Sequence, residues 1–261
     1  MPEYSGRFES TVPYYARFRP RYPAALFELI ATQRKLDGRG RLLDLGCGPG
    51  FIAIGMTPYF AEVVGVDPEP AMLEAARQEA ERAHVALTLI HGSSQTLGPA
   101  LGTFRMATMG RSFHWMDRDA TLAKLDTIIE PGGAIALLGE RLLDAPENGW
   151  RAAWEIVSRR YAAPRAYRRH WTNPAWERHE TVVLRSPFSQ IDRVAVTGRR
   201  TSSLEDLIGR AYSMSSTSIA FLGERREAFE RELRAALLEF SPSGTFDEIG
   251  ECAAMIASRP G

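Results

Sequence analysis

Two short apolar runs, each followed closely by an acidic residue and joined through a glycine-rich turn, constrain the fold of this chain most. The sequence "RLLDLGCGPG" at residues 41–50 places glycine at every second position of the turn, and the second run, "VVGVD", ends at Asp67. Gly46, Gly48 and Gly50 can adopt backbone angles that other residues avoid, so the chain can turn sharply from strand to helix and bring its backbone against a ligand. The pattern predicts a strand, a turn, a helix and a second strand that together bind a nucleoside-bearing cofactor.

The two acids indicate which kind of cofactor fits this turn. Asp44 stands near the carboxyl end of the first strand, where a carboxylate can accept hydrogen bonds from a ligand amine or pair with its positive charge. Asp67 is placed to accept both hydroxyls of a ribose. The glycine spacing is G-x-G-x-G, whereas dinucleotide-binding turns have G-x-G-x-x-G, and an acid beside the turn would repel a pyrophosphate. We therefore expect a cofactor with a cationic amino-acid end, and an NAD-dependent dehydrogenase is the less favoured enzyme class.

Composition bounds the partners and the location of the protein. The 261 residues include 32 basic and 32 acidic side chains, so no global field attracts nucleic acid or a membrane surface. No apolar run approaches the roughly 20 residues that span a bilayer, and the first residues lack a signal-peptide pattern, so we expect a cytoplasmic protein. Cys47 and Cys252 are too few for a disulfide framework or a structural zinc site, and we expect Cys47 to be a small filler residue in the turn.

Apolar runs typical of buried strands alternate with segments of helical spacing in the first half of the chain. The expected strands are 42–45, 63–66, 86–90, 106–109 and 134–138, and the expected helices are 23–36, 71–83 and 120–129. Pro58 should shorten the helix that follows the glycine turn. The alternation predicts an α/β fold with a parallel, doubly wound sheet that helices cover on both faces.

The alternation lapses after Gly139. Residues 141–187 carry helical patches and several prolines, and beyond them we expect strands at 191–196 and 251–258 and helices at 204–212 and 224–240.

Four segments together resemble the class I S-adenosylmethionine-dependent methyltransferases. They are the glycine turn with Asp67, "IHGSSQTLG" after the third strand, "RSFHWMDRDATLAKLDTIIEPGGAIALL" after the fourth, and "TVPYYARFRPRYP" near the amino terminus. The last two resemble a small-molecule subgroup that includes trans-aconitate methyltransferase-like proteins. The resemblance implies S-adenosylmethionine as the cofactor and a mostly parallel, seven-stranded, Rossmann-like sheet whose last strand is antiparallel. It also implies a lid and cofactor-binding half at 1–140, a helical cap at 141–187, and the C-terminal strands with inserted helices at 188–261.

The resemblance implies roles for the cofactor-binding residues. Asp44 and the backbone of the glycine turn would hold the methionine end, and Asp67 would hold the ribose. Ser93 and Gln95 would lie on the adenine side, where many members have an acid at the position of Ser93. A serine hydroxyl would bond an adenine edge less strongly than a carboxylate, and an ordinary turn is the alternative for this segment.

In the same subgroup the Phe-His-Trp segment lies at the open edge that faces the transferable methyl group. His114 is therefore the candidate general base or substrate-orienting group, because an unperturbed imidazole titrates near neutrality. Alternatively, His114 bonds the backbone and Trp115 walls the cofactor pocket.

The aromatic, arginine-rich amino-terminal segment of the subgroup folds over the cofactor. Arg19 would bind the carboxylate of the cofactor with a two-pronged contact, and Tyr14 or Tyr22 would close the pocket. The alternative is a solvated arm whose tyrosines pack on the surface.

Two features after residue 150 leave the nature of the acceptor open. Twelve arginines against six acids between Arg151 and Arg210 would suit an anionic substrate, or they would lie on solvated helix faces. The residues Trp150, Trp154, Trp171 and Trp176 would line an aromatic pocket or belong to the core. Residues 212–217, "YSMSST", resemble a substrate-side loop, and Asp117 with Asp119 match a metal site too thinly, so we expect no metal.

The sequence therefore predicts an enzyme that transfers a methyl group from S-adenosylmethionine to an oxygen, nitrogen or carbon atom of a small molecule. We expect a monomer or a homodimer with no nucleic-acid or membrane partner. A methyltransferase-fold protein that binds the cofactor without catalysis is the alternative from a non-enzyme class.

Overall fold

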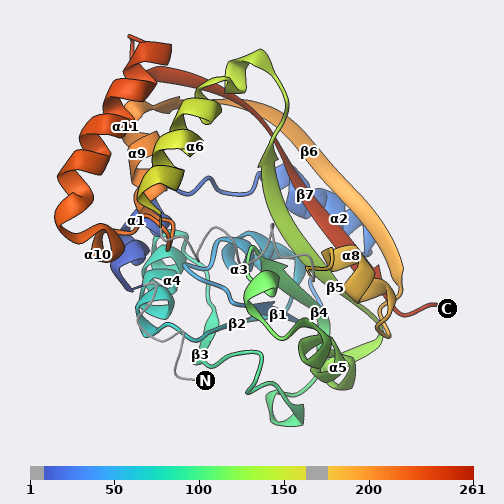
Figure 1. The fold of residues 1–261 in the computed structure, drawn as a ribbon. Helices are drawn as coiled ribbons and strands as arrows, with labels where there is room; N and C mark the ends of the chain where they lie inside the picture. Colours follow the sequence, from blue (N-terminus) through green and yellow to red (C-terminus); the bar gives the residue numbers. More distant parts are fainter. Residues whose placement is uncertain (1–8, 163–175) are drawn as a thin grey trace. The chain divides into compact units, whose positions relative to one another are not determined.

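A computed structural model of the chain shows seven strands in one sheet, in the order β3-β2-β1-β4-β5-β7-β6 (Figure 1). The structure describes residues 9–162 and 176–261. The strands are β1 (Arg41–Leu45), β2 (Glu62–Asp67), β3 (Thr88–His91), β4 (Phe104–Gly110), β5 (Ile129–Leu142), β6 (Gln190–Ser203) and β7 (Thr245–Ser258). Strands β1 to β5 pair in parallel, and one antiparallel hairpin completes the sheet. The predicted doubly wound, mostly parallel α/β fold is confirmed.

Helices form wherever the sequence predicts one, and a helix at residues 12–18 has no counterpart among the expected helices. The helices are α1 (Val12–Phe18), α2 (Ala24–Gln33), α3 (Phe51–Met56), α4 (Pro70–Arg82), α5 (Arg118–Ile128), α6 (Trp150–Tyr161), α8 (His179–Leu184), α9 (Leu204–Tyr212), α10 (Ile219–Leu222) and α11 (Arg226–Phe240). Asp117 caps α5 by accepting from the Ala120 N–H, and Ser203 with Asp206 forms a capping box at the start of α9. Helix α3 ends at Met56, and Pro58 lies in the 3-10 turn that follows, as predicted.

The strands of the second half are longer than the sequence predicts. Strand β5 begins at Ile129, opposite Phe104, and the next matched pair is Ala134 with Met106, so residues 130–133 bulge out of the ladder. The sequence "EPGG" at residues 130–133 forms this bulge. Strand β5 then continues past Leu138 through polar residues, because backbone pairing with a neighbouring strand does not require apolar side chains.

The chain divides into two compact units. The sheet unit comprises residues 21–140, 177–196 and 252–261, and the helical unit comprises the described residues of 1–20, 141–176 and 197–251. Strands β5, β6 and β7 each begin in one unit and end in the other. The expected parts at 1–140, 141–187 and 188–261 each contribute residues to both units, and that three-part division stays a prediction.

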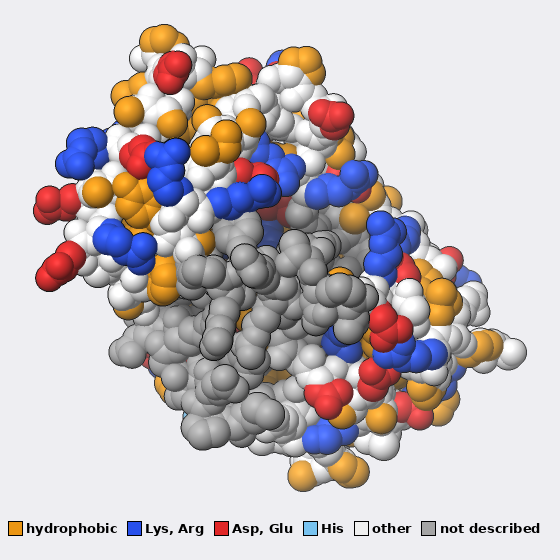
Figure 2. Space-filling view, viewed as in Figure 1, with side chains coloured by type: hydrophobic (Ala, Val, Ile, Leu, Met, Phe, Trp, Pro, Cys, Tyr) orange, Lys and Arg blue, Asp and Glu red, His pale blue; other side chains and the backbone are white. Residues whose placement is uncertain are grey.

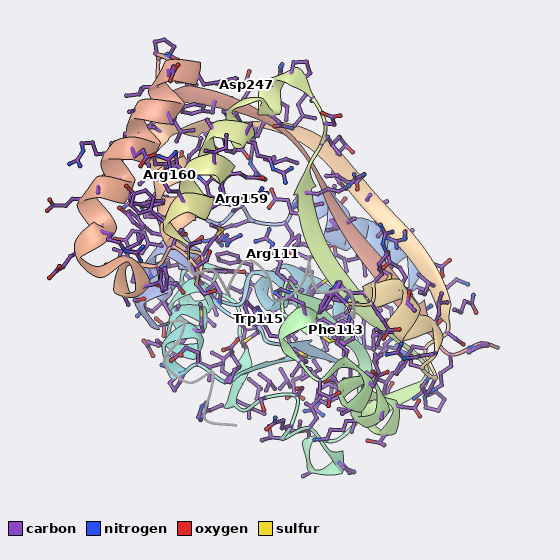
Figure 3. All side chains as sticks on the ribbon, in the orientation of Figure 1. Arg111, Phe113, Trp115, Arg159, Arg160 and Asp247 are labelled. Atoms are coloured by element: carbon purple, nitrogen blue, oxygen red, sulfur yellow. The ribbon has the colours of Figure 1, made fainter. Side chains whose placement is uncertain are left out.

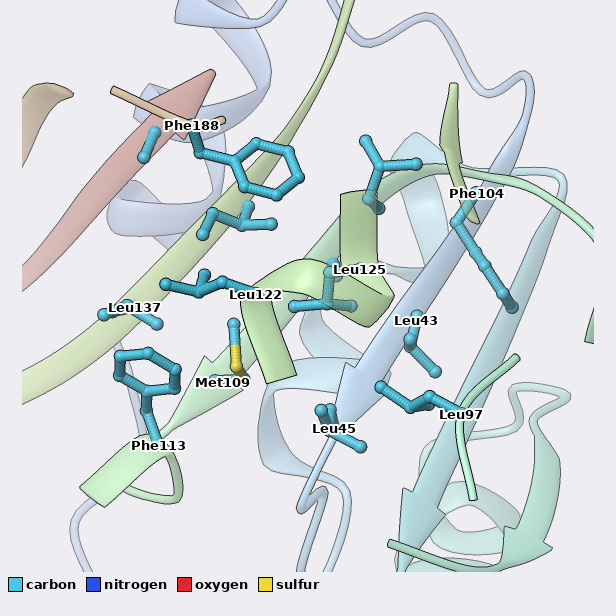
Figure 4. Packing of buried hydrophobic residues seen from close by; sticks show 14 of the residues in the cluster. Leu43, Leu45, Leu97, Phe104, Met109, Phe113, Leu122, Leu125, Leu137 and Phe188 are labelled. Carbon is cyan, nitrogen blue, oxygen red and sulfur yellow. The ribbon is translucent and has the colours of Figure 1, made fainter. Parts of the chain in front are cut away.

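The sheet unit has an apolar core on each face of its strands. Leu43 and Leu45 of β1 point into a cluster with Leu122, Leu125 and other residues from α5 and α8, which Figure 4 shows from close by. Leu42, the neighbour of Leu43, points into the other cluster with residues of α2 and α3. Successive side chains of a strand face opposite sides of a sheet, so an all-apolar strand produces two cores.

The helical unit has its own core, which joins α6, α9 and α11 to the ends of the long strands. Trp150, Tyr212 and Phe229 are buried in it. Helix α1 packs on α9 at Gly209, where an added Cβ would lie 2.3 Å from the ring of Phe18. No helix within residues 9–162 and 176–261 is long and apolar enough to span a bilayer.

Candidate functional site

The glycine turn joins β1 to α3 with left-handed backbone angles at all three predicted glycines. The φ angles are 68° at Gly46, 54° at Gly48 and 79° at Gly50. A side chain is strained in this region, which explains the glycine at every second position. A Cβ on Gly46 would lie 2.5 Å from the Cβ of Ser112, the second residue after β4. The turn that ends β1 therefore packs directly on the segment that leaves β4.

The sheet reverses its strand order at this contact. Strands β1 and β4 are neighbours, although β2 and β3 lie between them in the sequence. Sheets of this kind bind ligands in the crevice beyond the carboxyl ends of the strands where the order reverses. The glycine turn and residues 111–115 both lie at this edge, so the structure brings the predicted cofactor side and the Phe-His-Trp segment to one end of the sheet.

The Asp67 carboxylate fixes the turn from the end of β2. One oxygen accepts from the Gly48 N–H at 2.8 Å and the other from the Glu69 N–H at 2.9 Å. Burial raises the pKa of Asp67, and the two hydrogen bonds oppose that shift. The structure thus places Asp67 against the glycine turn, and its contact with a ribose stays a prediction.

Asp44 is almost completely buried and ties β1 to β4 and α3. Its oxygens accept from the Thr108 hydroxyl at 2.8 Å and from the Ala53 N–H at 3.2 Å. Burial raises the pKa of Asp44 to about 7, although both hydrogen bonds act in the opposite direction. A carboxylate can accept more than two hydrogen bonds, so its contact with a cofactor amine stays a prediction.

Ser93 and Gln95 lie in the turn that follows β3. The Ser93 hydroxyl accepts from the Gln95 N–H at 3.2 Å, and the Ser93 N–H donates to the Thr96 hydroxyl at 2.9 Å. These bonds are those of an ordinary turn, the alternative weighed for this segment. The Gly92 N–H donates to the Asp67 carbonyl, which fixes the turn beside the end of β2.

His114 lies in the 3-10 turn η4 (Phe113–Trp115) just beyond β4, and its side chain is half-buried. The rings of His114 and Trp115 are neighbours, with centroids 4.9 Å apart. The Ser112 hydroxyl donates to the Leu45 carbonyl at 2.8 Å and so fixes this turn to β1. Figure 3 labels Phe113 and Trp115 on this segment. The geometry is compatible with both readings of His114.

Arg111 is a further candidate, and its place as the first residue of the Phe-His-Trp segment assigns it no role by itself. It follows β4 directly, in the same segment as His114, and its Nη2 donates to Glu140 Oε2 at 2.8 Å. Its Cζ lies 5.1 Å from the ring centroid of Tyr22, whose hydroxyl donates to the Leu138 carbonyl at 3.2 Å. The sequence signal for Arg111 is weak. It consists only of an arginine at the position after a strand where a turn residue such as glycine is expected.

The predicted lid residues fall in both units. Tyr14 packs edge-on against Tyr212, and Arg19 Nε donates to the Ser213 hydroxyl at 2.8 Å, both within the helical unit. Tyr22 is buried in the sheet unit. The tyrosines therefore pack on protein, while closure over the cofactor stays a prediction.

Local acids account for most of the arginine excess after residue 150. Arg151 and Arg159 both pair with Glu155 on α6, and further pairs join Arg160 to Glu232, Arg185 to Asp119 and Glu177, Arg193 to Glu180, and Arg199 to Glu147. Figure 2 shows basic and acidic side chains interspersed on the face it presents. On α6 these pairs favour a solvated helix face, whereas Arg193 and Arg199 pair with acids from their positions on strand β6.

The tryptophans and the candidate metal ligands have structural partners. Trp150 is buried in the helical core, and Trp154 Nε1 donates to the Leu207 carbonyl at 3.1 Å, whereas Trp171 lies outside the described residues. Asp117 caps a helix and Asp119 pairs with Arg185. Within the described parts of the chain, no group of three or more His, Cys, Asp or Glu side chains could hold a metal ion. Cys47 is buried, and burial raises the pKa of its thiol, which suits a filler residue.

Space at the middle glycine tests whether the turn can receive a ligand. A Cβ on Gly46 or Gly50 would meet protein atoms within 3.4 Å, whereas a Cβ on Gly48 would meet nothing closer than the Met72 sulfur at 4.0 Å. Glycine is thus needed at Gly46 and Gly50 for packing, and at Gly48 it leaves the backbone open. An open backbone beside Asp67, the acid predicted to accept the ribose hydroxyls, fits a nucleoside-bearing cofactor.

Comparisons with known proteins identify relatives of this chain. Residues 42–133 match a family model described as a methyltransferase domain. An uncharacterised methyltransferase of Mycobacterium tuberculosis is 30% identical over 220 residues, which cover 80% of this chain and 78% of that protein. A probable S-adenosylmethionine-dependent methyltransferase of Saccharomyces cerevisiae is 30% identical over 146 residues, 54% of this chain and 49% of the yeast protein. Trans-aconitate 2-methyltransferase of Methylobacterium radiotolerans is 33% identical over 126 residues, 47% of this chain and 46% of that protein. The chain thus spans about half the length of two of these relatives.

Solved structures share the fold. A proposed type II methyltransferase from Anaeromyxobacter dehalogenans has a TM-score of 0.61 and 21% identity, with 93% of this chain and 98% of that chain covered. An S-adenosylmethionine-dependent methyltransferase from Thiobacillus denitrificans, in complex with S-adenosyl-L-homocysteine, has a TM-score of 0.52 and 14% identity, covering 97% of this chain and 98% of that chain. At these identities the likeness is one of fold.

Proposed function

The chain belongs to the class I S-adenosylmethionine-dependent methyltransferases, and from that premise we propose that it methylates a small-molecule acceptor. S-adenosylmethionine is the cofactor. When bound, it supplies an electrophilic methyl group. The acceptor, the roles of individual residues, the cytoplasmic location and the monomeric or dimeric state are the proposed part.

Three parts of the sheet unit would hold the cofactor. The open backbone at Gly48, with Asp44 nearby, would receive the methionine end. Asp67 would accept the ribose hydroxyls, and the turn of Ser93 and Gln95 would border the adenine. The fit is supported by the left-handed glycines and by the hydrogen bond from Gly48 to Asp67.

The observation that carries the acceptor side is the contact between Gly46 and Ser112. It fixes η4, and with it His114, to the edge of the sheet where the cofactor turn lies. His114 would then hold or accept the proton of an acceptor group, while positioning of the nucleophile supplies most of the rate. A small acceptor is supported by the zero net charge and by the relative named for trans-aconitate, a small anionic compound.

The test is a transfer assay with methyl-labelled S-adenosylmethionine and a panel of small carboxylic acids, phenols and amines, alongside tRNA and a protein extract. We expect label in a small-molecule product that mass spectrometry identifies. Label in the protein or RNA fraction would contradict the proposal. Cofactor binding without transfer to any fraction would favour the non-catalytic binding protein.

His114→Asn tests the residue within the same assay, and His84→Asn, at an exposed histidine just beyond α4, is the matched control. If His114 moves a proton, His114→Asn should lower kcat roughly 100-fold or more while the affinity for S-adenosylhomocysteine stays unchanged. Equal kcat in both variants would leave His114 as a pocket residue only.

A further inference from the structure

Arg111 has a backbone conformation that its surroundings do not explain in the usual way. Among the described residues other than glycine, Lys35, His84 and Arg111 have positive φ, with 55° at Arg111. Lys35 and His84 each follow the C-cap residue of a helix, where the chain commonly ends a helix with one left-handed residue. Both helix ends have the expected hydrogen bonds, from Leu36 to Ala31 and from Val85 to Ala80.

Arg111 follows a strand instead of a helix. A left-handed position at the end of a strand is normally given to glycine, because any side chain there is strained. Strained positions of this kind concentrate where a protein binds ligands. The strain at Arg111 occurs at the carboxyl end of β4, beside the Ser112 contact with the glycine turn.

The side chain of Arg111 is held in place and is not fully covered. The side chains of Arg111 and Glu140 retain 18% and 12% of their exposure, and the distance between Nη2 and Oε2 is 2.8 Å. The guanidinium also lies over the Tyr22 ring, at 5.1 Å from its centroid. An ion pair that is largely removed from water contributes little net stability, because desolvation offsets the attraction. The contribution to stability therefore does not by itself explain why Arg111 and Glu140 form an ion pair here.

We propose that Arg111 is a specificity-determining residue that binds a carboxylate of the methyl acceptor. A guanidinium has five N–H donors in a rigid fork, so it can hold Glu140 and a second carboxylate together. Glu140 and Tyr22 keep the guanidinium oriented. Both contacts lie within the sheet unit. The inference rests on the proposed function, because it assigns the acceptor side to this edge of the sheet.

Three variants separate recognition from folding. Arg111→Gly relieves the left-handed conformation, so a loss of acceptor binding in this variant cannot be attributed to backbone strain. Arg111→Lys keeps the charge without the fork, and Arg39→Gln, at a highly exposed arginine, is the matched control. All are first titrated with S-adenosylhomocysteine, and we expect affinities within about twofold of wild type. If the wild type fails to bind it, the proposed function fails, independently of Arg111.

The direct readout is the Nε–Hε signal of Arg111 in protein with labelled arginine, saturated with S-adenosylhomocysteine. The probes are succinate, citrate and benzoate, with their neutral amides and inorganic phosphate as comparisons. We expect at least one carboxylate to shift the Arg111 signal, its amide to leave it in place, and Arg111→Gly to weaken binding of that carboxylate at least tenfold. Arg39→Gln should bind it as wild type does.

Several results would overturn the inference while leaving the proposed function intact. One is that the wild type binds S-adenosylhomocysteine but no carboxylate shifts the Arg111 signal. Another is that phosphate alone shifts the signal. The third is that wild type and Arg111→Gly bind the carboxylate with equal affinity. With an acceptor identified by the transfer assay, the same role predicts a KM raised at least tenfold in Arg111→Lys with a smaller change in kcat. A change in kcat alone would contradict recognition by Arg111.

Discussion

At the scale of single residues, the acids that the sequence marks for the cofactor also hold the turn that would receive it. Asp67 accepts from the Gly48 N–H, and Asp44 accepts from the Ala53 N–H in α3. The sequence predicts which residues gather at the carboxyl ends of the strands, because the spacing of the motif follows from the backbone conformation of the turn. It does not predict the partner that each carboxylate has within the protein, since Thr108 reaches Asp44 from a strand 64 residues away along the chain.

The raised pKa of Asp44 predicts a pH dependence of stability. Burial raises this pKa to about 7, whereas an unfolded chain has a value of about 4. Between these values the folded protein keeps a proton that the unfolded chain releases, so Asp44 lowers the free energy of unfolding as the pH rises, by at most about 1.4 kcal/mol per pH unit. We expect Asp44→Asn to flatten this decline in urea unfolding between about pH 4 and 7.

The control for Asp44 is Asp37→Asn. Asp37 is exposed, and its hydrogen bond with Arg105 lowers its pKa, so it is ionised in both states over most of this range. Its substitution should leave the slope as in wild type. A slope in Asp44→Asn equal to that of wild type would contradict a raised pKa of Asp44.

The glycine turn predicts a large effect of one methyl group. Gly46→Ala combines a left-handed backbone with a collision against Ser112, whereas Gly132→Ala has φ of 75° and nothing within 4 Å of its Cβ. Gly132→Ala should cost about 1 kcal/mol of unfolding free energy from strain alone. Gly46→Ala should cost clearly more and lower the affinity for S-adenosylhomocysteine at least tenfold. Equal stability and affinity in the two variants would show that Ser112 can move away from the added methyl group at no cost.

At the scale of elements, the sequence predicts α2, α4 and α5 well, because periodicity and caps are local signals, whereas α1 is not predicted. The ends of β5, β6 and β7 are not predictable in this way. Residues such as Gly139 and Arg141 in β5, or Arg199 and Arg200 in β6, have no apolar alternation, and only pairing with distant strands makes them extended. The same limit hides Arg111, whose significance lies in a backbone angle that no local pattern fixes.

A buried carboxylate joins β6, β7 and α9 in the helical unit. Glu248 on β7 accepts from Arg210 on α9 and from Arg200 and Ser202 on β6, and its side chain is 0% exposed. Burial raises the pKa of Glu248, but the bonds and charge of Arg210 and Arg200 outweigh it and lower the pKa overall. Glu248 therefore stabilises the fold above its unfolded pKa, and that contribution is lost as the pH falls through its folded value.

Glu248→Gln should destabilise the protein by about 3 kcal/mol, because it leaves two guanidinium groups without their buried counter-charge. Glu251→Gln on the same strand is the matched control. Glu251 pairs with Arg141 at a more exposed position, so its loss should cost less than about 1 kcal/mol. Urea unfolding at pH 7 measures both, and similar losses in the two variants would contradict a special role for Glu248.

At the scale of the whole molecule, most of the residues proposed to hold the cofactor belong to one unit, and the predicted lid residues Tyr14 and Arg19 do not. Asp44, the glycine turn, Asp67, the Ser93 turn and His114 are all in the sheet unit, whereas Tyr14 and Arg19 belong to the helical unit. The sheet unit has a complete two-faced core of its own. Cofactor binding should therefore depend first on the sheet unit, and Arg19→Ala tests the contribution of the lid without removing the buried Tyr22, which a deletion of residues 1–22 would do.

Calorimetric titration of the purified protein with S-adenosylhomocysteine, and separately with NADH, tests the central claim most directly. Asp67→Asn is titrated with the same two ligands, and Asp37→Asn is the control. We predict that wild type and Asp37→Asn bind S-adenosylhomocysteine and not NADH, and that Asp67→Asn binds at least tenfold more weakly because an amide cannot replace the carboxylate at the ribose and the turn. Binding of NADH without S-adenosylhomocysteine, or full affinity in Asp67→Asn, would contradict a cofactor site built on this turn.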